Sequence, residues 1–259
     1  MKILAVVNSK GGVGKTTTAV NLSARFASGD ARVLLIDLDS QSSASFSLGV
    51  GRQNLTPSIG NVLFDQTSIQ ESVRQTSIDG LNLITGSMEL ANADVIMANV
   101  KGRENQLKLA VERISDEYAY IVFDCPPSLS ILTVNALVTA EAFIVPMCPQ
   151  YLALEGVITL LSAVEKIQEG IGETAEFLGI LLTMVDKRSS AVEELIQMVR
   201  NHYKDTVFDT EIGISSALAQ APGFGQSIYD YAPGSNGSKA YTELTIEILD
   251  RMLKKEGEN

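Results

Sequence analysis

The chain has 259 residues, of which 45% are hydrophobic and 20% are charged. Such a composition is typical of a soluble globular protein and excludes collagenous, low-complexity and wholly disordered chains. Thirty-one acidic residues against 20 basic ones give a net charge of −11, which excludes a uniformly basic nucleic-acid coat but not a local basic patch.

Short apolar, β-branched runs alternate with helix-length amphipathic stretches along the chain. The predicted strands cover residues 3–7, 33–36, 81–85, 120–123, 142–146 and 177–184, and the predicted helices cover 15–28, 101–116, 129–138, 152–169, 190–202 and 238–255. Strands this apolar, without alternation of polar and apolar residues, indicate a sheet buried on both faces. Strand–helix alternation implies right-handed crossovers, so we expect a doubly wound, mostly parallel α/β sheet with helices on both faces.

The organisation of the chain indicates one domain over residues 1–259, because there is no internal repeat and no linker rich in Pro and Gly. The least regular stretch, 49–80, is expected to form an excursion at the edge of the sheet. The last predicted helix has an acidic polar face and four large apolar residues on the other face: Tyr241, Leu244, Ile248 and Met252. A membrane-surface helix would need a basic polar face, so we expect this helix to pack on the domain.

The first residues run from a short apolar strand directly into glycines, without the apolar region or cleavage site of a signal peptide. No apolar run approaches the ~20 residues that span a bilayer. The two cysteines, Cys125 and Cys148, are too few for a disulfide framework, and their spacing matches no zinc pattern. We therefore expect a cytoplasmic protein with reduced thiols.

The sequence Ser-Lys-Gly-Gly-Val-Gly-Lys-Thr, residues 9–16, follows the first strand and opens the next helix. It matches the general phosphate-binding loop from its second glycine onward. The glycines let successive backbone N–H groups turn toward phosphate oxygens, and the helix beginning near Lys15 adds its positive end. We expect Lys15 to reach the β- and γ-phosphates and Thr16 to bind Mg²⁺ through its hydroxyl. The predicted nucleotide contacts are Lys10, Gly11, Gly12, Val13, Gly14, Lys15, Thr16 and Thr17.

Carboxylates follow two of the apolar strands, at the end where parallel strands face a ligand crevice. Asp37 and Asp39 follow the second strand and, being two apart, share a face of an extended backbone. One carboxylate is suited to orient a water nucleophile while the other supports the Mg²⁺ shell. Asp124 ends the strand at 120–123 and precedes two prolines. The alternative for these carboxylates is a structural role, such as capping a turn.

An additional lysine, Lys10, stands at the start of the loop and resembles the signature lysine of the deviant Walker A ATPases, the ParA/MinD group. Residues 37–41, Asp-Leu-Asp-Ser-Gln, are similar to that family's Asp-x-Asp-Pro-Gln motif, with serine in place of proline. The strand ending at Asp124 resembles its Walker B element. Further similarity at 146–156 and 182–186 extends the resemblance over nearly the whole chain, and it is closest to the short chromosomal ParA (Soj-like) type.

The resemblance implies an ATPase that uses ATP and Mg²⁺ and has three catalytic residues: Lys10, Lys15 and Asp39. Thr16, Asp37 and Asp124 would organise the metal, Asp37 near its shell and Asp124 through water. The signature lysine of the family crosses a dimer interface to the partner's nucleotide, so ATP would hold a homodimer together. Slow hydrolysis would be stimulated by an activator protein, ParB-like or a cargo adaptor. The implied activity is partition of a chromosome or plasmid, or placement of another cargo.

Proteins of this type usually bind DNA without sequence preference through basic residues in the last third of the chain. The candidates here are Lys187, Arg188, Arg200 and Lys204. Two arginines of the family pattern are missing, near Ile214 and Ala217, and each lost phosphate contact weakens a salt-dependent affinity. The alternative for the basic residues is a solvated helix face. Two binding surfaces for the protein therefore stay open, namely nucleoid DNA and the surface of another protein.

Three other branches share this loop. The MinD branch positions the division site and carries a basic amphipathic membrane-targeting tail, which is not seen in this sequence. The nitrogenase iron protein needs paired cysteines that Cys125 and Cys148 do not supply. Amide-forming synthetases of the cobyrinate a,c-diamide type use the loop to activate a carboxylate, and they are the main alternative. An ATPase that responds to a metabolite rather than to a protein activator would favour them.

Overall fold

The computed structural model describes residues 2–29, 31–150 and 153–256. In chain order the strands are β1 (Lys2–Val6), β2 (Val33–Asp37), β3 (Arg74–Gln75), β4 (Leu81–Ile84), β5 (Tyr120–Asp124), β6 (Ala142–Met147), β7 (Glu176–Val185) and β8 (Val207–Gly213). They form an eight-stranded sheet in the order β3-β4-β2-β5-β1-β6-β7-β8. Neighbouring strands are parallel except β3 and β4, which are antiparallel.

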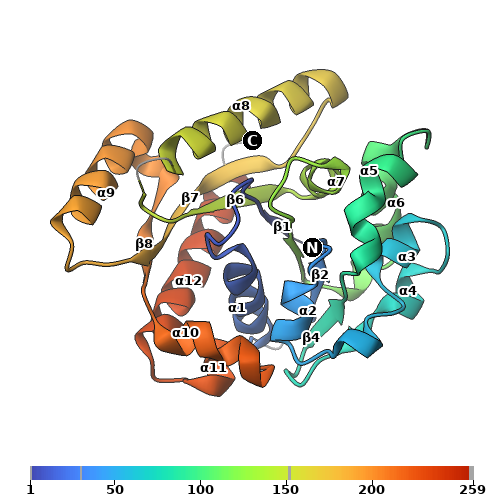
Figure 1. Ribbon diagram of the computed structural model, residues 1–259, viewed down its shortest axis with the longest axis horizontal. Helices are drawn as coiled ribbons and strands as arrows, with labels where there is room; N and C mark the ends of the chain where they lie inside the picture. Colours follow the sequence, from blue (N-terminus) through green and yellow to red (C-terminus); the bar gives the residue numbers. More distant parts are fainter. Residues whose placement is uncertain (1, 30, 151–152, 257–259) are drawn as a thin grey trace.

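Helices cover both faces of this sheet (Figure 1). The α-helices of one face are α3 (Ile59–Leu63), α4 (Ile69–Ser72), α5 (Ala93–Ile96), α6 (Gln106–Val111), α7 (Ile131–Thr139), α8 (Ala153–Ile171) and α9 (Ser190–Tyr203). Those of the other face are α1 (Lys15–Ala27), α2 (Ser43–Ser47), α10 (Ser216–Gln220), α11 (Ile228–Tyr231) and α12 (Asn236–Glu256). Short 3₁₀ turns connect them: η1 (Arg52–Asn54), η2 (Met88–Asn92), η3 (Arg103–Asn105), η4 (Ser115–Glu117), η5 (Lys204–Thr206) and η6 (Ala221–Phe224).

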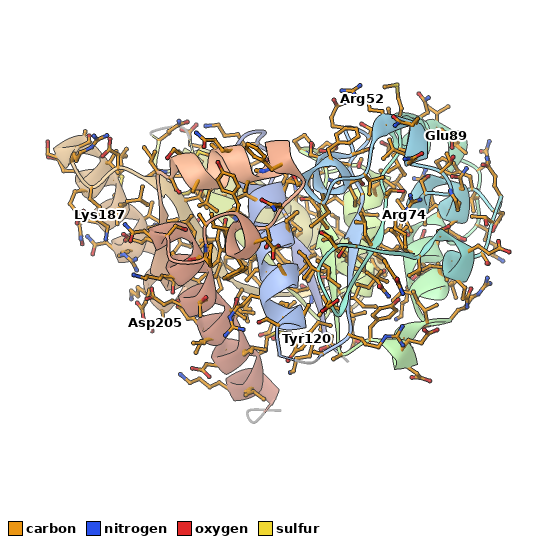
Figure 2. The ribbon with its side chains drawn as sticks, turned by 90° about the horizontal axis from the view of Figure 1, so that it is seen from below. Arg52, Arg74, Glu89, Tyr120, Lys187 and Asp205 are labelled. Atoms are coloured by element: carbon orange, nitrogen blue, oxygen red, sulfur yellow. The ribbon has the colours of Figure 1, made fainter. Side chains whose placement is uncertain are left out.

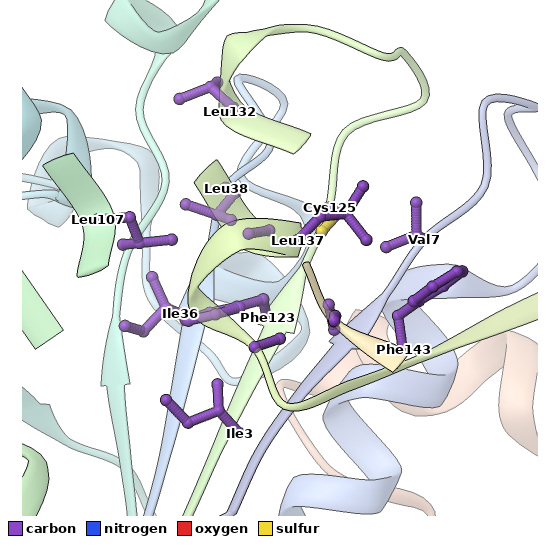
Figure 3. Close-up of a cluster of buried hydrophobic side chains, with 14 of the residues drawn as sticks. Ile3, Val7, Ile36, Leu38, Leu107, Phe123, Cys125, Leu132, Leu137 and Phe143 are labelled. Carbon is purple, nitrogen blue, oxygen red and sulfur yellow. The ribbon is translucent and has the colours of Figure 1, made fainter. Parts of the chain in front are cut away.

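The apolar strands supply both cores, because successive side chains of a strand point to opposite faces. In β1, Ile3 packs into the core beneath α7, while Leu4 packs into the core beneath α1. Figure 3 shows the first of these cores, which joins Leu137 of α7 and Leu107 of α6 with sheet residues such as Ile36 and Phe123. The predicted doubly wound, mostly parallel sheet is therefore confirmed.

Each predicted strand forms, but two observed strands were not predicted. β8 was missed because Asp209 and Glu211 interrupt its apolar residues. β3 is only a two-residue edge strand, and it ends the irregular stretch 49–80, which lies at the sheet's edge as expected.

The predicted helix 101–116 was wrong in extent. Gly102 has a left-handed φ of 67°, and only the 3₁₀ turn η3, the six-residue α6 and the 3₁₀ turn η4 form in this range. α8 matches the predicted helix 152–169, whose first residue lies outside the described residues.

The closing helix α12 packs as expected against α1 and β8 (Figure 1). Its predicted apolar residues are all buried: Tyr241, Leu244, Ile248 and Met252. The Tyr241 hydroxyl lies 3.1 Å from the Thr18 hydroxyl of α1. Across the described ranges, no helix is both long enough and apolar enough to cross a membrane.

Candidate functional site

The glycine-rich loop connects β1 to α1 at the carboxyl end of a central strand, with β5 and β6 on either side. Gly12 and Gly14 have φ values of 73° and 85°, a left-handed conformation that favours glycine. Gly14 caps α1 without a side-chain hydrogen bond, so the first N–H groups of the helix face outward for a ligand. A side chain added at Gly11 or Gly12 would meet nothing within 4 Å, so the space over this part of the loop is open.

Both lysines of the loop are held near its mouth. The Lys15 ammonium group donates a hydrogen bond to the Lys10 main-chain oxygen at 2.9 Å, and the Lys10 ammonium group donates to Gln150 Oε1 at 2.9 Å. Burial lowers the pKa of Lys15, although the nearby Asp124 works against this change. Neither ammonium group has an ion-pair partner in the part of the chain that the structure describes. The loop therefore carries two cations that an anionic ligand can neutralise.

Thr16 and Asp124 form the part of the site that fits a divalent cation. The Thr16 hydroxyl donates to Asp124 Oδ2 at 2.7 Å, and Asp124 Oδ1 is buried without a hydrogen-bond partner. Burial, and then the neighbouring Asp37, raise the pKa of Asp124 well above its usual value. An unpaired buried carboxylate oxygen is costly, and a cation or a water bound to one would satisfy it. The described residues hold no cluster of three or more His, Cys, Asp or Glu ligands, so phosphate oxygens and water would complete the coordination of a Mg²⁺ ion here.

Asp37 lies beside Asp124, since the two residues are register partners on β2 and β5. Its Oδ1 accepts a hydrogen bond from the Asp39 N–H at 3.1 Å, and its Oδ2 accepts from the Ser45 N–H and hydroxyl at 2.9 and 2.7 Å. Burial raises the pKa of Asp37 to about 6, against the effect of the Ser45 hydrogen bonds. Both carboxylate oxygens of Asp37 therefore accept hydrogen bonds from the segment that follows β2, and the place of Asp37 near a metal shell stays a prediction.

Ser45 was not found from the sequence, because nothing in its spacing from the motif indicates a contact. Its hydroxyl donates to Asp37 and accepts from the Gly86 N–H at 3.2 Å, so it joins the ends of β2 and β4. A side chain at Gly86 would lie 2.4 Å from the Asp39 main-chain oxygen, so only glycine fits there.

Asp39 lies just beyond the end of β2 and is partly exposed. Its Oδ1 accepts from the Gln41 N–H at 2.9 Å, and within the described ranges its Oδ2 has no hydrogen bond. Asp39 also contributes to the electrostatic surroundings of the Lys15 ammonium group. One of its oxygens is therefore free to bind water at the mouth of the loop.

An apolar cavity of about 330 Å³ adjoins the loop at the carboxyl ends of β7 and β8. It is lined by Gly14, Thr17, Thr183, Met184, Ile212, Gly213, Ile214, Ser215, Leu218, Ala219 and Tyr241. The Thr183 hydroxyl donates to the Val13 main-chain oxygen at 2.9 Å, which fixes this cavity against the loop. The cavity was not predicted from the sequence, where residues 182–186 were noted only for their similarity to the family. Its size and apolar lining suit a flat heterocycle beside the phosphates.

The candidate DNA-binding residues are mostly engaged with carboxylates. Lys187 lies 3.2 Å from Glu211, and Arg200 lies 3.0 Å from the same residue. Arg188 makes two hydrogen bonds of 2.8 and 2.9 Å to Asp186. These contacts reduce the positive charge that the surface presents to a phosphate backbone.

The fourth candidate, Lys204, follows Arg200 by one helical turn at the end of α9 but lies apart from Lys187 and Arg188. It begins η5, before β8, whereas Lys187 and Arg188 follow β7 at the opposite end of the sheet. Figure 2 shows this separation through Lys187 and Asp205, the residue after Lys204. The four basic residues therefore do not gather at one place.

The fold and the loop together define a P-loop nucleotide-binding protein. Residues 1–177 match the family model described as an AAA domain. The chain is 37% identical over 247 residues to the sporulation initiation inhibitor protein Soj of Bacillus subtilis, covering 95% of this chain and 98% of that protein. It is 36% identical to the chromosome partitioning protein ParA of Caulobacter vibrioides, covering 97% and 95% of the two chains. The chain belongs to the ParA/Soj family of P-loop ATPases.

Solved structures extend the comparison. Cobyrinic acid a,c-diamide synthase from Mycobacterium smegmatis, with bound ATP analog and magnesium, is 32% identical and has a TM-score of 0.85, covering 96% of this chain and 94% of that one. An ATP complex of a McdA variant from Cyanothece has the same TM-score at 21% identity, covering 97% and 96%. At that identity the likeness to McdA shows the fold alone.

Proposed function

We propose that this protein is a ParA-like partition or positioning ATPase that couples ATP binding and slow hydrolysis to the placement of DNA or another cargo. The observation that carries the proposal is the loop with two lysines, Lys10 and Lys15, beside the Thr16–Asp124 pair. The names of the relatives Soj and ParA support the same function.

In this proposal the phosphates of ATP lie on residues 10–17 and the base occupies the apolar cavity. Thr16 holds Mg²⁺ with its hydroxyl, and Asp124 holds it through water. When bound, the ion neutralises charge that develops on the phosphate oxygens. Lys15 exchanges the Lys10 main-chain oxygen for the β- and γ-phosphates, and Asp39 orients the attacking water with its free oxygen. Asp37 keeps the backbone of Asp39 in place through the hydrogen bond described above.

Lys10 is proposed to act in a homodimer. Its ammonium group donates to Gln150 in an exposed hydrogen bond, which costs little to exchange. In an ATP-bound dimer it would reach the phosphates of the partner's nucleotide. An activator protein, ParB-like or a cargo adaptor, would then complete the geometry for hydrolysis, because phosphoryl transfer depends on positioning.

We also propose that the ATP-bound dimer associates weakly with nucleoid DNA in the cytoplasm, through Lys187, Arg188, Arg200 and Lys204. The ion pairs of Lys187, Arg188 and Arg200 compete with phosphate contacts and therefore favour a weak interaction, which would still weaken further as salt is added. These basic residues do not distinguish partition of a chromosome from partition of a plasmid.

A second candidate function is an amide-forming synthetase, because a cobyrinic acid a,c-diamide synthase is 32% identical with a TM-score of 0.85. If this protein were such a synthetase, its ATPase activity would rise when a small carboxylic acid and an amine donor are added. A partition ATPase would instead respond to a protein and ignore both compounds.

The decisive experiment uses Asp39→Ala, which should bind ATP, hydrolyse it poorly and accumulate as a dimer. Light scattering after gel filtration would measure the dimer, and DNA binding would be followed with ATP and with ADP across a salt series. Asp116→Ala is the control, since this exposed carboxylate precedes β5 at the end opposite Asp124. Normal turnover in Asp39→Ala would remove Asp39 from its role. An ATP dimer without DNA binding would move the site of action to a protein surface.

A further inference from the structure

Asn8 joins the start of the phosphate-binding loop to a neighbouring strand. It follows β1, which pairs with β6 (Figure 1), and it is only 3% exposed. Its side-chain Nδ2 donates a hydrogen bond to the Pro146 main-chain oxygen of β6 at 2.7 Å, and its Oδ1 accepts from the Lys10 N–H at 2.9 Å. Both ends of this buried amide are bonded, which fixes its orientation and places the Lys10 backbone relative to β6.

The same part of the chain, residues 146–150, also holds the tip of the Lys10 side chain. Gln150 accepts a hydrogen bond from the Lys10 ammonium group at 2.9 Å. Cys148 lies between Pro146 and Gln150 in sequence; burial raises the pKa of its thiol, and the nearby Lys10 opposes this change. Residues 146–150, which we call the Lys10 support, therefore contact both the backbone and the charged end of this lysine, the backbone through Asn8.

The contacts of Lys10 differ in how easily they are exchanged. The bond to Gln150 is exposed, and the bond from Lys15 to the Lys10 main-chain oxygen is only partly buried. The bond from Asn8 to Pro146 is buried, and a buried donor or acceptor that loses its partner has no water to replace it. Asn8 would therefore keep hold of the Lys10 backbone when the other two contacts are given up. A lysine that swings from a fixed backbone loses less conformational freedom when its ammonium group reaches a new partner.

We propose that Asn8 is a positioning residue for Lys10. It fixes the backbone from which the Lys10 ammonium group reaches the partner's nucleotide, and it thereby strengthens the ATP-bound dimer without touching the nucleotide itself. The inference rests on the proposed function in one respect, the role of Lys10 in that dimer. The alternative is a purely structural role for Asn8, in which its loss lowers stability but leaves dimer formation and the place of Lys10 unchanged.

The first test measures dimer formation of Asn8→Ala by sedimentation equilibrium with Mg²⁺ and a nonhydrolysable ATP analogue. The dimer should weaken about tenfold or more, because the backbone of Lys10 then loses its link to β6. The affinity of the monomer for a fluorescent ATP analogue should change by less than about threefold, since Asn8 contacts no phosphate in this proposal.

Asn135→Ala is the matched control. Asn135 is also a buried asparagine with both ends of its amide bonded, but its partners Leu107 and Arg103 do not belong to the loop. This variant should lose stability to a similar degree and keep normal dimer formation. Equal dimer formation in Asn8→Ala and Asn135→Ala would overturn the proposal.

A second variant, Asn8→Ser, separates the link to β6 from the local turn. A serine hydroxyl accepts an N–H two residues ahead in the same kind of turn, but it is too short to bridge to Pro146 as well. Asn8→Ser should therefore fold and bind the nucleotide, and its dimer should still be weakened. It also decides the question if Asn8→Ala does not fold. Normal dimer formation in Asn8→Ser would contradict the proposal.

The thiol of Cys148 reports the place of Lys10 without any nucleotide. Removal of the nearby positive charge in Lys10→Ala should raise the pKa of Cys148, which the pH dependence of its reaction with iodoacetamide measures. Asn8→Ser should move this pKa in the same direction, because Lys10 is then held less closely over its support, and Asn135→Ala should not move it. A pKa that rises in Lys10→Ala but not in Asn8→Ser would overturn the proposal.

The variants separate this inference from the proposed function. Normal ATP-dependent dimer formation in Lys10→Ala would contradict the proposed function, and the pKa of Cys148 would still decide whether Asn8 holds Lys10. A monomeric Lys10→Ala together with normal dimers of both Asn8 variants would contradict the inference alone.

Discussion

The ammonium group of Lys15 donates a hydrogen bond to the main-chain oxygen of Lys10 at 2.9 Å, so one lysine of the loop rests on the backbone of the other. The Lys10 side chain points away to Gln150. The two cations therefore have separate places at the loop, one inward and buried, the other at its rim. This arrangement supports the proposal that Lys15 acts in nucleotide binding and Lys10 in dimer formation.

Lys15→Ala should weaken nucleotide binding by about tenfold to a hundredfold, because hydrogen bonds to charged groups contribute about 1.5–3 kcal/mol. Titration with a fluorescent ATP analogue would measure the loss. Unchanged affinity in Lys15→Ala would refute the assignment of the loop.

Lys10→Ala should bind the nucleotide normally as a monomer but form no ATP-dependent dimer. Lys166→Ala on α8 serves as the control, because this lysine is also exposed.

Ser45→Ala should lower the free energy of unfolding by about 1–3 kcal/mol, because it removes a hydrogen bond to a buried carboxylate and leaves the Gly86 N–H unpaired. Urea unfolding would measure the change. Ser43→Ala, on the same helix, is partly exposed and should change the stability by less than about 0.5 kcal/mol. A stability of Ser45→Ala equal to that of the control would show that the Asp37 network contributes nothing.

Glu247 of α12 predicts a dependence of stability on pH. Burial raises the pKa of Glu247, but hydrogen bonds from the Thr210 and Asp209 N–H groups and from Arg251 lower it. The hydrogen bonds together outweigh burial, so the pKa lies below the ordinary 4.5. A carboxyl with a depressed pKa stabilises the folded state above its unfolded pKa, and this contribution disappears as the pH falls through the folded pKa. Glu247→Gln should therefore be less stable than the unmodified protein at pH 7.

The difference between Glu247→Gln and the unmodified protein should shrink as the pH falls below the ordinary value of 4.5. Urea unfolding at a series of pH values would follow it. Glu243→Gln, an exposed carboxyl of the same helix, provides the control. A difference that stays constant down to about pH 3 would contradict a depressed pKa for Glu247.

The two thiols should differ in reactivity. Cys125 is buried, and burial together with Asp124 raises the pKa of its thiol far above the usual value. Cys148 is only partly buried; burial raises the pKa of its thiol, against the effect of the nearby Lys10. Because its sulfur is the more accessible, Ellman's reagent should modify Cys148 in the native protein and Cys125 only after unfolding, and Cys148→Ser should abolish the native reaction. Rapid reaction of a second thiol in the native protein would show that Cys125 is accessible.

Much of the fold was predictable, because the central strands are apolar enough to be recognised without tertiary information. β8 was not, because its charged residues Asp209 and Glu211 are satisfied by partners that only the fold brings near, such as Arg200. The helix at 101–116 failed for a local reason, the left-handed Gly102.

The candidate site divides in the same way. The loop residues and Asp124 could be proposed from the sequence because the chemistry proposed for them needs residues close together in sequence or at a strand end. Ser45 and Thr183 were not, because each contacts its partner only through folding: Ser45 reaches Asp37 across the turn after β2, and Thr183 reaches Val13 from another strand. The apolar cavity was unpredictable for the same reason, since it forms between β7, β8 and the loop.

The division of the site between two parts of the chain has a consequence for how such proteins diverge. The matched segment 1–177 contains the loop, Asp37, Asp39 and Asp124, whereas most of the cavity is built from residues 183–219. On the proposed function, changes in the second part would alter which base is accepted while the proposed catalytic residues stay intact. Nucleotide selectivity and hydrolysis would then evolve separately in a protein built this way.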